Sequence, residues 1–289
     1  MTARTLVIAA VFGGIILTGV AVGCRAAWSD ATSLFRNPVW LFRSMLSMNV
    51  VAPIVASIVA VGFHLEPPVK IALVACSVSP MPPFLPKKAM GAGGERSYVI
   101  GLLVAASLLS IVIVPLTLEF FEWVSGVPLD ISPLRIARSV GLSVLLPLGV
   151  GMTIHQLAPA LAARVAKPIG IVATVLLAVG VLAVAIKTGP DMWELVGNRS
   201  LVAMTVFALV ALLVGHALGG PLEGDRATLA LSTASRHPGV PVAIASANFP
   251  NQPLVVPAVL MIVIVATIVS IPYLKWIAHT GMTVPGDTA

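Results

Sequence analysis

Charged side chains are scarce along this chain. Of its 289 residues only 10% are Asp, Glu, Lys or Arg, whereas 58% are hydrophobic, and the mean hydropathy is +1.04. A water-soluble domain needs more polar surface than this composition supplies, so a soluble globular fold is excluded. Runs of about 20 apolar residues, each long enough to cross a hydrocarbon core about 30 Å thick, recur from one end to the other. The composition predicts an all-α polytopic membrane protein.

The chain also lacks the features of several other protein classes. It has no run of Lys and Arg and no basic patch interleaved with aromatic residues, so its net charge of +6 does not indicate nucleic-acid binding. Its two cysteines, Cys24 and Cys76, lie among apolar residues, and each is interpreted as a small buried side chain. Slightly more of the Lys and Arg in the short loops lie on the side of the membrane where the C-terminus is expected than on the side of the N-terminus. That bias predicts a multi-pass protein of the cell (inner) membrane with its N-terminus outside and its C-terminus in the cytoplasm.

Hydropathy and helix-breaking residues predict about nine crossings of the membrane. Those expected to be continuous cover residues 4–24, 38–63, 97–119, 135–156, 168–187, 200–218 and 254–278. Two others, over residues 69–93 and 226–248, are interrupted. The connections are short and no water-soluble domain is inserted between the spans, so we expect one membrane domain.

The two interrupted spans are broken in the same manner. Residues 79–94 read SPMPPFLPKKAMGAGG and residues 235–250 read SRHPGVPVAIASANFP; each places prolines in mid-span, followed by a short half-helix and a Gly or Pro turn. Four spans precede the first long loop and five follow it, so the two broken units run in opposite directions. The pattern predicts two inverted repeats, residues 1–125 and 126–289, whose discontinuous helices cross near the membrane midplane.

Prolines at these breaks deprive the backbone of hydrogen bonds. A proline has no amide N–H and clashes with the carbonyl four residues earlier, so carbonyls near Pro82, Pro83, Pro86, Pro238 and Pro241 lose their helical partners. Unpaired carbonyls are costly in lipid, so this backbone must line protein or a water-filled cavity. Free carbonyls attract cations, and the N-termini of the half-helices attract anions. The breaks are therefore where we expect a binding site.

Acidic side chains are missing from the interior of every predicted span, and the nearest of the 11 is Glu95, at a turn. No carboxylate is available there to hold a buried Na⁺ or a proton, and no pair of acids could perform general acid–base chemistry. A membrane-embedded enzyme would need a metal cluster or a constellation of acid, nucleophile and base at membrane depth, and the sequence shows none. We expect no catalytic residue, no metal ligand set and no cofactor.

Basic residues do occur at membrane depth. Lys87, Lys88, Arg236 and His237 fall inside the breaks. A Lys or Arg in mid-span costs roughly 2.5–3.5 kcal/mol on insertion scales and normally marks function. The alternatives are a lysine that extends to the interface and a histidine that only hydrogen-bonds the broken backbone.

Neutral polar residues beside the breaks complete the predicted substrate site. The candidates are Asn49, Ser79, Pro80, Lys87, Lys88, Ser232, Thr233, Ser235, Arg236 and His237. For each hydroxyl the alternative is a hydrogen bond to a carbonyl of its own helix.

Three stretches resemble a known family, the bile acid/sodium symporter family. NPVWLFRSMLSMNVVAPIVA is similar to an early span of that family. ALVACSVSPMPPFLPKKAMGAGGERSYVIGLLVAASLLSIVIVPLT is similar to its first crossover helix, and DRATLALSTASRHPGVPVAIASANFPNQPLVVPAVL to its second. The resemblance covers essentially the whole chain. It implies two inverted five-helix repeats, arranged as a core of crossing helices and a flanking panel, with the first helix of the first repeat missing here.

The same resemblance shows where this chain differs. Members that use sodium carry a glutamate in the second crossover, followed by paired amides; here Ser232 takes the glutamate position, and Arg236 and His237 take the amide positions. The polar residue of the family's earlier span matches Asn49 or its neighbour Met48. Because the family's sodium ligands are replaced, we expect transport that does not require Na⁺.

The residues and the resemblance together predict a secondary transporter that moves a small organic anion by alternating access. Lys87, Lys88 and Arg236 would attract the anion, the lysines would supply charge in place of sodium, and His237 would couple transport to protons. The alternatives are a sodium-coupled symporter with non-carboxylate ligands and a non-transporting membrane sensor on the same fold. The expected partners are the organic anion and the lipid bilayer; the sequence does not indicate an oligomeric state.

Overall fold

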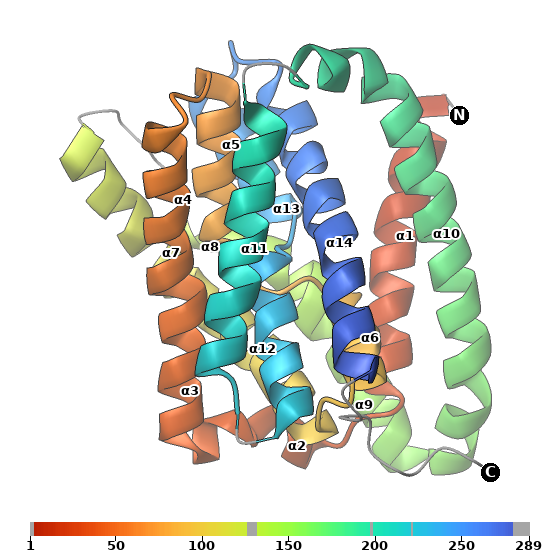
Figure 1. Cartoon of the computed structure of the whole chain (residues 1–289). Helices are drawn as coiled ribbons and strands as arrows, with labels where there is room; N and C mark the ends of the chain where they lie inside the picture. The colour runs from red at the N-terminus through yellow and green to blue at the C-terminus, as the bar shows by residue number, and fades with distance from the viewer. Residues whose placement is uncertain (1–2, 126–131, 197–198, 221, 280–289) are drawn as a thin grey trace.

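The computed structural model describes residues 3–125, 132–196, 199–220 and 222–279. These residues form helices and turns, with no strand among them. Within them, 7 helical segments are long and apolar enough to cross a membrane, and each overlaps a span predicted to be continuous; Pro159–Glu194, with 36 residues, is much longer than the predicted 168–187. The helices run side by side as a bundle (Figure 1). The all-α polytopic class is confirmed, whereas the nine crossings and the inverted repeats stay predictions, and the proposed boundary at residue 126 lies outside the described residues.

The bounds of the elements follow in chain order. They are α1 Ala3–Gly23, α2 Trp28–Thr32, η1 Leu34–Arg36, α3 Pro38–Met45, η2 Leu46–Val51, α4 Ala52–Gly62, α5 Pro67–Ser77, α6 Leu85–Gly91, α7 Arg96–Ser125, α8 Pro133–Val140, η3 Gly141–Leu145, α9 Leu146–Leu157, α10 Pro159–Glu194, α11 Ser200–Leu218, α12 Glu223–Ala234, α13 Gly239–Asn248 and α14 Val255–His279. Elements η2 and η3 are π-helical turns. Each joins two α-helices into one span, α3–η2–α4 and α8–η3–α9.

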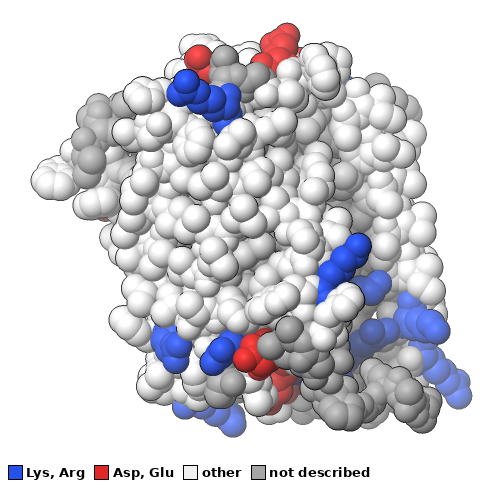
Figure 2. Space-filling view, in the orientation of Figure 1, with Lys and Arg blue, Asp and Glu red and all other residues white. Residues whose placement is uncertain are grey.

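The outer surface of the bundle is apolar. On α10, the side chains of Val179, Leu182 and Ile186 are 58%, 61% and 72% exposed. Figure 2 shows a broad band with few charged residues across one face of the molecule, with Lys, Arg, Asp and Glu gathered toward its two ends. Exposed apolar side chains of this kind are unfavourable in water and favourable against lipid tails, so the band is the part of the protein that faces the hydrocarbon.

Helices α1, α9 and α10 pack together on one side of the bundle (Figure 1). Glycines allow α1 and α9 to touch through their backbones: a Cβ on Gly23 would lie 2.2 Å from the carbonyl oxygen of Leu148, and one on Gly151 would lie 2.3 Å from that of Val20. Small residues permit such close approach between helices in membranes. We refer to this group as the panel helices; their correspondence to the flanking panel that the resemblance implies stays a prediction.

The other long helices form the core. Helix α11 packs on α12, α14 packs on α5, and α7 packs on α2 and η1. One cluster of buried apolar side chains surrounds α7 and includes Ile100 and Leu103, and a second lies between α5, α11 and α14 and includes Leu73, Phe207 and Val259. The two interrupted segments run through this core. Non-helical residues separate α5 from α6 and α12 from α13. These helix breaks lie at the positions that the prolines predicted.

The two spans that contain a π-helical turn are built alike. Pro38–Gly62 and Pro133–Leu157 each have 25 residues and begin with a proline. In each span the α-helix that follows the π-turn has a second proline in its first turn, Pro53 in α4 and Pro147 in α9. Single π-turns inside α-helices occur frequently at functional sites. Both of these turns contact the second break.

Candidate functional site

Arg236 lies in the break between α12 and α13, and only 3% of its surface is exposed. Its guanidinium donates three hydrogen bonds to main-chain carbonyl oxygens: Nη2 to Met48 at 2.6 Å, Nη1 to Ser79 at 2.9 Å and Nε to Thr233 at 3.0 Å. These oxygens belong to η2, to the break after α5 and to the last turn of α12. The arginine therefore fastens the two breaks and the π-turn together.

The carbonyl of Met48 is free because of the π-turn and the proline that follows it. At the end of η2 the N–H of Ala52 bonds to the carbonyl of Ser47, five residues earlier. The next N–H in that pattern would reach Met48, but residue 53 is Pro53 and has no N–H. The guanidinium supplies the missing donor, as a buried carbonyl requires.

The carbonyls of the first break are free for a similar reason. In a helix, the carbonyl of Ser79 would accept from a residue three or four positions later, but Pro82 and Pro83 have no N–H. Its oxygen bonds the guanidinium instead, and the carbonyl of Pro80 accepts the N–H of His237 at 2.9 Å. The two breaks are thus in direct hydrogen-bond contact, which confirms that the interrupted segments meet at their breaks.

The ring of His237 is hydrogen-bonded on both sides and is 3% exposed. Its Nδ1 accepts the N–H of Gly239 at 3.0 Å, and its Nε2 lies 3.3 Å from the Oγ of Ser143 in η3. Because Nδ1 accepts, we assign the proton of the neutral ring to Nε2, which donates to Ser143; the Ser143 hydroxyl in turn donates to the carbonyl of Ser139 at 2.6 Å. A purely structural role for His237, as a hydrogen-bonded side chain within the helix break, accounts for both hydrogen bonds of its ring. The role of His237 in proton coupling stays a prediction.

These residues form one connected group. We call Met48, Ser79, Pro80, Thr233, Arg236 and His237 the crossing cluster. The sequence predicted freed carbonyls beside the prolines of both breaks, and the Ser79 carbonyl is one of these; the Met48 carbonyl, which lies before Pro53 in another span, was not predicted.

The hydroxyl groups of the predicted site bond mainly to their own helices. The side chains of Ser79, Ser232 and Thr233 each donate to a carbonyl four residues earlier, at 2.7 to 3.1 Å. The hydroxyl of Thr233 also lies 2.8 Å from that of Ser47, which ties α12 to η2. The sequence did not single out Ser47 or Ser143, because a small serine within an apolar run carries no distinguishing pattern.

The two lysines are not among the described hydrogen-bond partners of the crossing cluster. Both are on α6, where Lys87 is exposed and Lys88 is half-buried. Neither donates to the carbonyls that bind Arg236. An exposed lysine at this position fits the alternative of a side chain that extends toward water.

Two further predicted residues border the cluster. Asn49 is half-buried, and its Nδ2 donates to the Sδ of Met45 at 3.2 Å. The adjacent Met48 contacts Arg236 through its backbone oxygen. Which of the two matches the polar residue of the family stays a prediction. Ser235 is 8% exposed and directly precedes Arg236 in the break.

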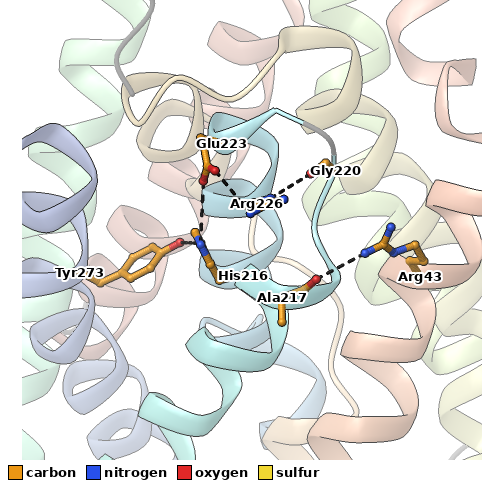
Figure 3. A network of polar contacts seen from close by, with 7 residues as sticks. All are labelled: Arg43, His216, Ala217, Gly220, Glu223, Arg226 and Tyr273. Carbon is orange, nitrogen blue, oxygen red and sulfur yellow. Dashed lines mark hydrogen bonds and ion pairs between the residues drawn. The ribbon is translucent and has the colours of Figure 1, made fainter. Parts of the chain in front are cut away.

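A separate polar network lies at the end of the bundle where α11 and α14 end and α12 begins (Figure 3). Glu223 pairs with Arg226 at 3.3 Å and lies 3.9 Å from the Nε2 of His216. The Nδ1 of His216 is 2.9 Å from the hydroxyl of Tyr273. At the same end Arg43 donates to the carbonyl of Ala217 at 3.3 Å, which joins α3 to α11. This network connects four helices of the core.

The ion pairs of Glu223 with His216 and Arg226 belong to this network, and Arg236 takes part in neither. Carbonyl dipoles satisfy hydrogen-bond donors but carry no net charge, so the crossing cluster keeps the full positive charge of the arginine. A buried cation without a counter-ion is costly in a membrane and marks a functional position.

A cavity of about 170 Å³ opens beside the polar network. It is lined by Ser33, Leu34, Asn37, Trp40, Glu95, Ser97, Tyr98, Gly220, Leu222 and Asp225. It shares no residue with the crossing cluster, whose members are buried. In this conformation the cluster is therefore closed to the surrounding solvent.

Comparisons with known proteins agree with this architecture. A model of the Sodium Bile acid symporter family matches residues 13–194. Sodium/bile acid cotransporter 4 of Homo sapiens is 24% identical over 245 residues, which cover 82% of this chain and 55% of that protein. The protein of the same name from Rattus norvegicus gives the same identity and coverage. The chain thus spans about half the length of the curated relatives it matches.

Proposed function

The chain belongs to the sodium bile acid symporter family, a family of transporters, and on that premise we propose that it is a secondary active transporter of a small organic anion. The observation that carries the proposal is Arg236, a buried cation at the junction of two broken helices with no described carboxylate among its contacts. Transport by alternating access would expose this junction to one side of the membrane at a time.

The chemistry of Arg236 favours an anion as the substrate. A guanidinium has five N–H donors, and carbonyls take three of them here. Its planar fork binds a carboxylate with two parallel hydrogen bonds, and its charge is always present. An anion that reached the cluster would remove the cost of the unpaired charge, and that gain would drive its binding.

The closed state of the crossing cluster requires a conformational change during transport. The bond between His237 and Ser143 joins the second break to the span that leads into α9. In the proposed cycle the panel helices α1, α9 and α10 move relative to the core, and this bond breaks and re-forms. Lys87 and Lys88 on α6 would be positive charges that an anion meets on its way in.

We propose that the N-terminus faces outward and the C-terminus faces the cytoplasm of a cell membrane. Figure 2 supports this orientation, because Lys and Arg are more numerous toward the lower end of that view, where α14 ends. Basic residues are enriched on the cytoplasmic side of membrane proteins. Fusion of a reporter that is active only in the cytoplasm to residue 289 would be fluorescent in this orientation and dark in the opposite one.

Uptake into proteoliposomes tests the proposed function. The relatives' name makes a radiolabelled bile acid the first probe, followed by short mono- and dicarboxylates. We expect saturable uptake of one of these anions, at a rate that is unchanged when sodium in the buffer is replaced by choline. Arg236→Gln is expected to abolish this uptake while the protein still inserts into the membrane.

Two results would favour the alternatives. A steep dependence on sodium would indicate a sodium-coupled symporter with carbonyl and hydroxyl ligands. Binding of an anion by the purified protein, without uptake under any ion gradient, would indicate a membrane sensor. A thermal-stability scan of Arg236→Gln serves as the control, because a loss of uptake bears on the substrate only where the variant remains folded; a folded variant with unchanged uptake would contradict the role of Arg236.

A further inference from the structure

The oxygens around Arg236 have the properties of a cation site. The residues that supply them, Met48, Ser79 and Thr233, are each 0% exposed, and the oxygens converge on one positively charged group. Two of these oxygens have lost their helical donors to prolines, so no rearrangement within their own segments can satisfy them. A buried carbonyl without a partner is strongly unfavourable. The site therefore requires an occupant that donates to several oxygens at once.

The arrangement of the oxygens indicates the shape of that occupant. Each oxygen bonds to a different nitrogen of the guanidinium, at 2.6, 2.9 and 3.0 Å. The three oxygens thus surround a flat group from three directions. A compact ion such as Mg²⁺ or Ca²⁺ needs all its oxygens within about 2.0–2.6 Å of one point, which would require these segments to move closer together.

We propose that these three carbonyls form a cation site whose permanent occupant is the chain's own guanidinium, and that a free guanidinium-type cation binds there when the arginine side chain is removed. In the native protein the position is filled, so no dissolved cation enters it. This inference goes beyond the proposed transport function and does not depend on it, since it concerns cation binding by the purified protein.

Arg236→Ala is the variant that tests the site directly. It removes the guanidinium and two methylene groups, and methylguanidinium restores the guanidinium and one of the two carbons, so it fits within the space that is left. We expect the thermal midpoint of Arg236→Ala to fall below that of the wild type and to rise again with millimolar methylguanidinium. At ten times its Kd the added ion raises the midpoint by roughly 2–3 °C. Methylurea, which has a similar shape and no charge, is expected to give no rise.

Matched controls separate this site from general effects of the ion. The wild type, whose site is filled, should not respond to methylguanidinium. Arg43→Ala removes another arginine that bonds a carbonyl, that of Ala217, at the end of the bundle (Figure 3). We expect no response from Arg43→Ala, because a single carbonyl oxygen at the exposed end of the bundle is too little to bind the ion. Choline chloride at equal concentration controls for ionic strength.

A second pair of variants addresses the same site without an added ligand. Arg236→Lys keeps a positive charge and three N–H donors. The side chain in Arg236→Met has a similar length but neither a charge nor an N–H donor. We expect the thermal midpoint of Arg236→Lys to lie between those of the wild type and Arg236→Met. This comparison keeps the proposal testable where Arg236→Ala does not fold.

Three outcomes overturn the proposal. One is a midpoint of Arg236→Met equal to or above that of Arg236→Lys. Another is a rise in the midpoint of folded Arg236→Ala with methylguanidinium that is no larger than the rise with methylurea. The third is stabilisation of Arg236→Ala by sodium chloride and not by methylguanidinium, which would indicate a compact ion site. Failure of anion uptake by the wild type would instead contradict the proposed transport function and would leave these thermal measurements unchanged.

Discussion

Two glycines set the distance between α1 and α9, and their replacement gives a quantitative prediction. In Gly23→Ala the new Cβ would lie 2.2 Å from the carbonyl oxygen of Leu148, and in Gly151→Ala it would lie 2.3 Å from that of Val20. A carbon atom in relaxed contact with a carbonyl oxygen lies about 3.3–3.6 Å away. Both oxygens belong to helix backbones, which cannot rotate aside as a side chain can. Either substitution must therefore push the helices apart by roughly 1 Å.

The expected loss follows from that displacement. Extra methyl groups in a packed interface cost about 1–3 kcal/mol. A gap of about 1 Å also removes up to half of the dispersion energy of each neighbouring contact. We therefore expect each substitution to lower the free energy of unfolding by about 2–3 kcal/mol, which corresponds to a fall of roughly 3–5 °C in the thermal midpoint of a chain of 289 residues.

The two substitutions should not be additive. Once the first methyl has separated the helices, the second enters the same gap, so the double variant Gly23→Ala/Gly151→Ala should lose less than the sum of the single losses. We expect a coupling of about 1–2 kcal/mol, within the range found for residues in contact. Thermal unfolding of the purified protein in one detergent measures all three variants.

Gly62→Ala is the matched control, since a Cβ at that position meets no atom within 4 Å. We expect its midpoint to equal or slightly exceed that of the wild type, because alanine favours a helix more than glycine does. Single losses no larger than the effect of Gly62→Ala, or strictly additive losses in the double variant, would refute the assigned contact.

Two further predictions concern tyrosine hydroxyls, both measured in the same thermal assay. Tyr98→Phe removes the partner of the buried Ser44 hydroxyl, 2.8 Å away, so we expect a loss of about 1–3 kcal/mol that Ser44→Ala largely recovers. A double variant as unstable as Tyr98→Phe alone would argue against this pairing. Tyr273→Phe removes the 2.9 Å contact with His216 at the partly exposed end of the bundle, so we expect a smaller loss of about 0.5–1.5 kcal/mol. An unchanged midpoint would mean that this contact does not stabilise the fold.

Much of the fold could be predicted because its causes are local. The apolar runs set the continuous spans, and the prolines of residues 79–94 and 235–250 placed the breaks where α5 ends and α6 begins, and where α12 ends and α13 begins. A proline acts on the backbone of its own helix, so its effect can be inferred from neighbouring residues alone. The inverted orientation of the two repeats depends on how the helices are arranged in space, and it stays a prediction.

The functional site was predicted less completely than the fold, and Met48 and Lys87 show why. Arg236 and His237 were identified because ionisable groups are rare at membrane depth. The role of Met48 depends on its backbone oxygen, and no side-chain pattern reports a free carbonyl inside a π-turn. Lys87 was included for its depth, but α6 has only 7 residues, too few for a periodic pattern to reveal that the side chain is exposed.

The hydrogen bonds of Arg236 also have a consequence for the order in which the protein matures. Met48 and Ser79 precede it by 188 and 157 positions. Synthesis proceeds from the N-terminus, so α3 to α7 emerge while the guanidinium that satisfies their carbonyls has not yet been made. The early spans can insert separately, but their carbonyls are satisfied only when α12 and the residues after it arrive. Two halves that look independent in the sequence therefore complete their folding together, at the end of translation.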